Sequence, residues 1–200
     1  MKKILPVFSY IFHPIFIPFY TICYYFSVTR EYYLTESIYL YLKQTLLITF
    51  LIPLAVFYLL VTYKKIDTIM AGKVTQRRIP LLLQTLLFLS LVIKTFTLEN
   101  TPLLFYFILA SAVSSSSAYL LTFWKKKISL HMLGIVSMTV FIIITSKAFQ
   151  LNNFMMIASL LLLNGVVASS RLALRAHTYE ELIQGFYIGA VPQMAIVYFL

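Results

Sequence analysis

Three short segments of this 200-residue chain concentrate the polar side chains that could do chemistry. They are residues 73–80, 129–131 and 170–181. Arginines and lysines in the first and third segments can supply charge-assisted hydrogen bonds, and the planar guanidinium group matches the oxygens of a phosphate. The side chains that we predict to bind phosphate are Arg171, Lys73, Arg77, Arg78 and Ser129. Together they predict a site for an anionic phosphate group.

Two histidines are candidates for catalysis, because each stands where a helix is expected to begin. His177 precedes a predicted helix, whose positive end favours the neutral imidazole that a nucleophile requires. Glu181 follows four residues later, at a spacing that can orient the imidazole. Thr178 and Glu181 also form the pattern of a capping box, a structural role that does not exclude the catalytic one. His131 follows Ser129 at another helix start, where backbone amides attract anions.

Other polar residues have simpler interpretations. We interpret His13 as a histidine that packs or hydrogen-bonds inside the first apolar block, and Arg175 as a contact for anionic headgroups. The run of lysines at 125–127 is expected at the membrane interface. No cluster of carboxylates suits magnesium, so we expect neither a metal nor a cofactor.

The elements that carry these residues are predicted to be transmembrane helices. The chain is 61% hydrophobic and only 11% charged, too little charge to cover the surface of a soluble domain. Its apolar residues occur in blocks of about 20, and these blocks lack the alternation of barrel strands. We therefore predict an all-α, polytopic bundle of seven spans: 4–26, 41–63, 80–98, 103–124, 128–147, 154–172 and 182–200.

The order of the predicted spans places the three polar segments on one face of the membrane. Two spans separate the first segment from the second, and two more separate the second from the third. Twelve of the sixteen lysines and arginines lie on the side that carries the N-terminus, which the positive-inside rule would place in the cytoplasm. Because basic residues that hold a phosphate would add to the same count, the orientation is left open.

The three segments resemble the signatures of the phosphatidic acid phosphatase type 2 superfamily. Segment 170–181 contains the pattern SRx5Hx3E, which is similar to the third signature, SRx5Hx3D. Segment 129–131 resembles the second signature, PSGH, and segment 73–80 resembles the first, Kx6RP. The order of the segments and the two-span intervals also match. The resemblance covers about residues 73–189, within a predicted single transmembrane domain of residues 1–200 whose phosphatase-like core is 64–200.

This resemblance implies a metal-independent lipid phosphatase. By position, His177 would attack phosphorus and become phosphohistidine, and His131 would protonate the leaving oxygen. Glu181 would orient His177. Those implied to hold the phosphoryl group are Arg171, Lys73 and either Arg77 or Arg78.

The expected substrate is a phosphomonoester or pyrophosphate of a membrane lipid, and the expected location is a bacterial cytoplasmic membrane. We expect membrane lipids and no nucleic acid as partners, while the number of subunits is left open. Ile128 and Leu130 stand where the second signature has proline and glycine, and Glu181 replaces an aspartate. One alternative is therefore a catalytically inactive relative that serves as a subunit of a membrane assembly. Another is a transporter or haem protein that uses the histidines.

Overall fold

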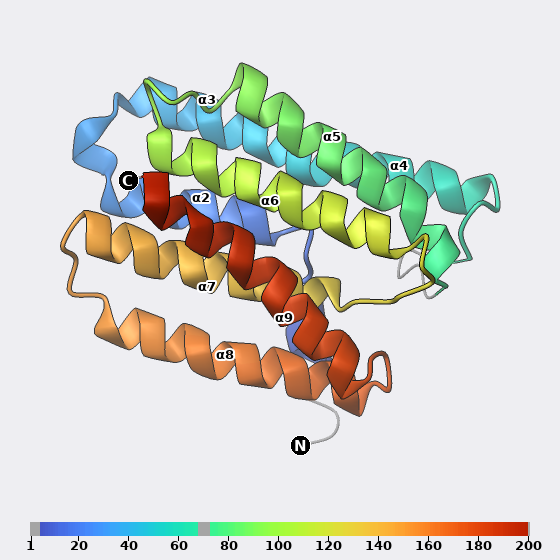
Figure 1. Ribbon diagram of the computed structural model, residues 1–200. Coiled ribbons are helices and arrows are strands. Elements are labelled where there is room, and N and C mark those ends of the chain that lie inside the picture. The colour runs from blue at the N-terminus through green and yellow to red at the C-terminus, as the bar shows by residue number, and fades with distance from the viewer. Residues whose placement is uncertain (1–4, 68–72, 200) are drawn as a thin grey trace. The chain divides into compact units, whose positions relative to one another are not determined.

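The computed structural model describes residues 5–67 and 73–199, and within these ranges the chain forms helices and no strand. This confirms the predicted all-α class. The predicted span ends at Ile4 and Leu200 lie outside the described residues. Figure 1 shows the order of the helices along the chain.

Five helical stretches of the described chain are long and apolar enough to cross a membrane. The first is Thr35–Thr62, made of α3 (Thr35–Leu46), the π-helical turn η2 (Leu47–Leu51) and α4 (Ile52–Thr62). The others are Val74–Lys94, made of the 3-10 turn η3 (Val74–Arg77) and α5 (Arg78–Lys94), then α6 (Pro102–Leu121), α7 (Leu130–Ala148) and α8 (Phe154–Ala173). The chain is therefore an integral membrane protein.

The remaining two predicted spans have a different form. The first is broken into α1 (Leu5–Ile11) and α2 (Ile17–Val28). Pro14 lies in the break, where it lacks an amide donor and disfavours helical backbone in the residue before it. The last consists of α9 (Tyr179–Met194), which has 16 residues, and a 3-10 turn, η4 (Ala195–Phe199). At about 1.5 Å per residue α9 alone is shorter than a hydrocarbon core.

Two compact units make up the chain. Unit 1 comprises Met1–Thr21 and Ile128–Leu200, and unit 2 comprises Ile22–Lys127. Segments 129–131 and 170–181 belong to unit 1, whereas segment 73–80 belongs to unit 2. The single-domain organisation stays a prediction.

In unit 2, α5 and α6 pack together through small polar side chains. The Ser115 hydroxyl on α6 donates to the Leu81 carbonyl, at 3.3 Å, and accepts from Thr85, at 3.1 Å. Ser115 and its neighbour Ser114 are buried. Small hydroxyl residues allow such close approach of two helices in a membrane.

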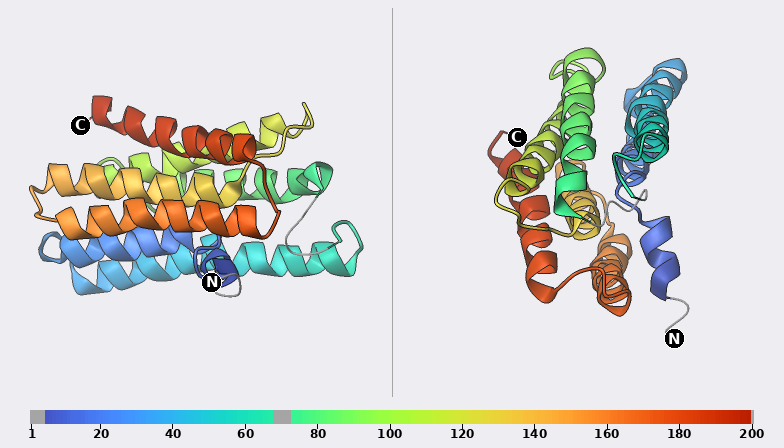
Figure 2. Two further views of the ribbon diagram at one scale, coloured as in Figure 1. Left: turned by 90° about the horizontal axis from the view of Figure 1, so that it is seen from below. Right: turned by 90° about the vertical axis from the view of Figure 1, so that its right-hand side faces the viewer.

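In unit 1, α7 lies between α8 and α9 as its most buried helix (Figures 1 and 2). Two glycines of α9 face the start of α7. A Cβ atom at Gly185 would lie 2.5 Å from the Ser129 carbonyl oxygen, and one at Gly189 would lie 3.0 Å from the Leu133 Cα. The Ser137 hydroxyl then donates to the Gly189 carbonyl at 3.0 Å. The glycines thus allow close backbone contact between the middle of α9 and the first turns of α7.

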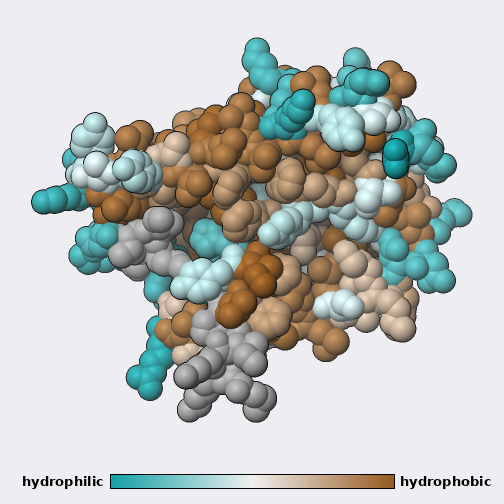
Figure 3. Space-filling model, turned by 180° about the vertical axis from the view of Figure 1, so that it is seen from behind, coloured by the Kyte–Doolittle hydropathy of each residue, from teal (hydrophilic) through white to brown (hydrophobic). Residues whose placement is uncertain are grey.

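Large apolar side chains cover much of the exterior. On α8, Met155 and Leu162 expose 79% and 74% of their surface. Figure 3 shows apolar side chains spread broadly over the face that it displays, with hydrophilic ones mainly toward its margins. An exterior of this kind suits contact with acyl chains.

Candidate functional site

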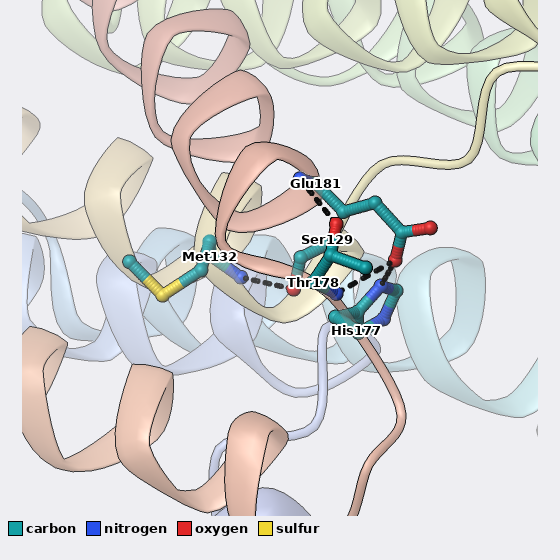
Figure 4. A network of polar contacts seen from close by, with 5 residues as sticks. All are labelled: Ser129, Met132, His177, Thr178 and Glu181. Atoms are coloured by element: carbon teal, nitrogen blue, oxygen red, sulfur yellow. Dashed lines mark hydrogen bonds and ion pairs between the residues drawn. The ribbon is translucent and has the colours of Figure 1, made fainter.

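The start of α9 holds His177 and Glu181 in direct contact. Nδ1 of His177 donates to Oε2 of Glu181 at 2.6 Å, and only 2% of the His177 side chain is exposed (Figure 4). The chain reaches this position after α8 ends at Ala173 and turns at Arg175, whose φ is +51°. A carboxylate at this distance accepts a proton from Nδ1, so an attack by the neutral imidazole would have to come from Nε2.

Glu181 also takes part in the cap of α9. The Thr178 hydroxyl accepts from the Glu181 amide at 3.3 Å, and the Thr178 amide donates to Oε2 of Glu181 at 3.4 Å. The predicted capping box is therefore present, and one carboxylate oxygen serves both the cap and the imidazole (Figure 4). Because the cap orders Glu181, it also orients His177.

The start of α7 lies beside the start of α9. The Ser129 amide donates to the Glu181 carbonyl at 3.0 Å. The Ser129 hydroxyl accepts from the Met132 amide at 3.4 Å, so this buried side chain is the N-cap of α7 (Figure 4). The predicted contact of Ser129 with phosphate stays a prediction.

His131, in the first turn of α7, is buried and bonded to α1. Its Nε2 donates to the Ser9 carbonyl at 3.0 Å, and 6% of the residue is exposed. The ring of His13 meets it edge to face, with centroids 5.2 Å apart. A proton on Nε2 places the lone pair of neutral His131 on Nδ1.

Arg171, near the end of α8, is a buried cation in the same unit. It exposes 7% of its surface, and its Nε has no hydrogen-bond partner among the described residues. Arg171 interacts electrostatically with both His13 and His131. His131 also interacts electrostatically with His177. A buried guanidinium with an unsatisfied donor is costly unless it is compensated, and an anion would compensate it.

His13 lies between α1 and α2, outside the five candidate spans. Burial and, to a smaller extent, the charge of Arg171 lower the pKa of its imidazole to about 4. His13 is therefore neutral at pH 7, and its Nδ1 accepts from the Ile15 amide at 3.4 Å. A neutral ring beside Arg171 avoids a second buried positive charge.

The basic residues of the first predicted segment have their own contacts within unit 2. Lys73 pairs with Asp67 at 2.9 Å in an exposed position, and hydrogen bonds first from Lys73 and then from Gln76 lower the pKa of Asp67. The Arg78 guanidinium lies 4.5 Å from the centre of the Phe123 ring and donates to the Thr122 carbonyl at 3.3 Å. Arg77 is buried.

The structure thus brings the second and third predicted segments together in unit 1 and describes the first within unit 2. It also shows that two further residues, Ser9 and His13, contact His131 at this site. A polar residue one turn before a histidine–proline pair, inside an apolar block, is the signal in the sequence that could have identified them.

In the part of the chain that the structure describes, no group of three or more His, Cys, Asp or Glu side chains could hold a metal ion. Comparisons with protein-family models, with curated proteins and with solved structures give no match to this chain.

Proposed function

We propose that this protein is a membrane phosphatase that hydrolyses a phosphomonoester or pyrophosphate of a lipid through a phosphohistidine. The contact between His177 and Glu181 carries the proposal. A buried imidazole whose Nδ1 is bound by a carboxylate is prepared to attack through Nε2, as histidines do when a third group orients them. The resemblance of the three polar segments to the type 2 phosphatidic acid phosphatases supports the same chemistry.

In the proposed reaction, Nε2 of His177 attacks phosphorus while the bond to the lipid oxygen breaks. The leaving oxygen takes a proton from Nδ1 of His131 in its doubly protonated form. Water then cleaves the phosphorus–nitrogen bond and gives a proton back to Nδ1 of His131, which releases phosphate and restores both histidines. Glu181 stabilises the imidazolium form at each step, and Arg171 compensates the charge of the phosphoryl oxygens.

The proposal extends to the first segment and to the location of the protein. Lys73 and either Arg77 or Arg78 would be the further phosphate contacts, as the resemblance implies. We further propose a bacterial cytoplasmic membrane, with membrane lipids as partners and a phosphorylated lipid as the substrate.

One contact favours the alternative function, a catalytically inactive subunit of a membrane assembly. Nε2 of His131 is engaged by the Ser9 carbonyl, so proton donation would have to come from Nδ1 of a doubly protonated ring beside Arg171. Such a cation is unfavourable unless an anionic substrate compensates it. A protein without activity toward any lipid phosphate would fit this alternative.

Phosphate release from a panel of lipid monophosphates and pyrophosphates, measured in EDTA, tests the proposal. The wild type should release phosphate, and His177→Asn should release none from any substrate. With a substrate labelled in its phosphate, the wild type should also form an acid-labile, alkali-stable phosphoprotein that His177→Asn lacks. His13→Gln provides a control, because it alters a histidine that we do not assign to bond breaking. A phosphoprotein that persists in His177→Asn would contradict the mechanism.

A further inference from the structure

The C-terminal end of α1 has one backbone acceptor, the Ser9 carbonyl, that receives no hydrogen bond from its own helix. In a continuing α-helix, the Ser9 carbonyl would accept from the amide of residue 13. The chain instead turns before Pro14, and the His13 amide donates to the Tyr10 carbonyl at 3.3 Å. The Ser9 carbonyl is thus one of the acceptors that a helix leaves without an intrahelical donor at its C-terminus.

Nε2 of His131 satisfies this acceptor, at 3.0 Å. The bond joins residues that are 122 positions apart in the sequence and is buried. A carbonyl can only accept, so the imidazole must carry a proton on Nε2. The end of α1 thereby selects one of the two neutral tautomers of His131, as a hydrogen bond to one ring nitrogen generally does.

A second contact fixes the same residue of α1. The hydroxyl groups of Ser9 and Ser170 lie 2.6 Å apart, and both residues are fully or almost fully buried. Ser170 precedes Arg171 on α8, so α1 and α8 are joined next to the buried guanidinium. Because this bond holds the Ser9 residue, it also holds the carbonyl that binds His131.

We propose that Ser9 is a positioning residue of the site, which holds His131 in the Nε2-protonated tautomer so that His131 meets the substrate through Nδ1. The functional part of this inference rests on the proposed phosphatase activity, whereas the tautomer does not. The N-terminal helix then helps to position a residue of the site, although it lies outside the region that resembles the phosphatase signatures.

Nitrogen-15 NMR of histidine-labelled full-length protein in lipid nanodiscs tests the inference directly. The chain has only three histidines, so His13→Gln and His177→Asn assign the spectrum. In the wild type at neutral pH, the His131 signals should show a protonated Nε2 and an unprotonated Nδ1. A His131 ring protonated on Nδ1 alone would overturn the proposal without any reference to activity.

Two serine variants test the role of the Ser9 side chain. Ser9→Ala and Ser170→Ala should each move His131 toward a mixture of tautomers, and the double variant should add little, because both remove one shared bond. Ser27→Ala is the matched control, since that hydroxyl is exposed and donates to the Tyr24 carbonyl one turn earlier. Wild-type His131 signals in Ser9→Ala would refute the positioning role.

Activity provides a separate readout. If the phosphatase proposal is right, Ser9→Ala should lower kcat on a lipid monophosphate about 10- to 100-fold, the range seen when an orienting partner is lost, with a much smaller change in KM. A KM effect alone would argue against positioning of His131. Absence of activity in the wild type, together with the expected tautomer, would count against the phosphatase but support the hydrogen-bond arrangement.

Discussion

Replacement of Glu181 by glutamine should separate the catalytic role of this residue from its role in the helix cap. Glutamine is accepted at the third position of a capping box, so the cap formed with Thr178 should survive. The 2.6 Å bond to Nδ1 of His177 would lose its charge. We therefore expect nearly unchanged thermal stability and a large loss of activity.

The size of the loss follows from the geometry of the His177–Glu181 pair. A hydrogen bond to a charged group contributes about 1.5–3 kcal/mol and a neutral one about 0.5–1.5 kcal/mol, so the imidazolium loses about 1–1.5 kcal/mol of stabilisation. That difference corresponds to about a tenfold loss of kcat/KM. If the amide group of glutamine turns toward the ring, it selects the wrong tautomer, a defect that can cost up to about 10⁴-fold. We expect a loss of at least about fivefold.

The assay is kcat/KM for phosphate release, measured with the unfolding temperature of each variant in the same nanodiscs. Glu180→Gln is the matched control, because Glu180 is an exposed acid in the same helical turn. Thr178→Ala should differ from Glu181→Gln in stability, with about 1 kcal/mol lost together with the cap. Equal activity in Glu181→Gln and Glu180→Gln would refute the orienting role of Glu181.

Three further outcomes are expected. Gly185→Ala should destabilise the protein by about 1–3 kcal/mol through the clash with the Ser129 carbonyl. Gly165→Ala should not, because no atom lies within 4 Å of the new Cβ. Equal unfolding temperatures of the two variants would contradict the close packing of α9. His131→Ala should lose about 10²–10⁴-fold in kcat/KM on a lipid monophosphate and much less on p-nitrophenyl phosphate, whose leaving group needs no proton; equal losses would count against an acid role. Activity should survive EDTA, and complete loss that a divalent ion restores would exclude the phosphohistidine mechanism.

The sequence was sufficient for the helical class and for five of the spans, because apolar blocks of membrane length have few other solutions. It was also sufficient for the contact between His177 and Glu181, since a spacing of four residues at a helix start is a local property. The first span was harder to predict. Mean hydropathy does not register that Pro14 removes a donor, so the break between α1 and α2 was missed.

The role of α1 could not be predicted because its contacts are not local. Ser9 meets Ser170 and His131 across more than a hundred residues, and no pattern in the sequence encodes such a pairing. The interpretation of His13 as a packing or hydrogen-bonding residue was correct in kind, since its ring packs on His131 and its Nδ1 accepts from the Ile15 amide. The identity of the groups that His13 contacts could not be predicted from the sequence.

The bond between the Ser129 amide and the Glu181 carbonyl has a consequence for how the protein can evolve. It aligns the starts of α7 and α9 through main-chain atoms alone, which every residue except proline can provide. Position 129 can therefore exchange its side chain, at the expense of the α7 cap, without losing this alignment. Selection on the alignment would act instead on Gly185, where any Cβ atom would meet the same serine carbonyl. A mutational scan should accordingly find that position 185 tolerates far fewer substitutions than position 129. This holds even though the hydroxyl at 129 is the group that could take part in a reaction.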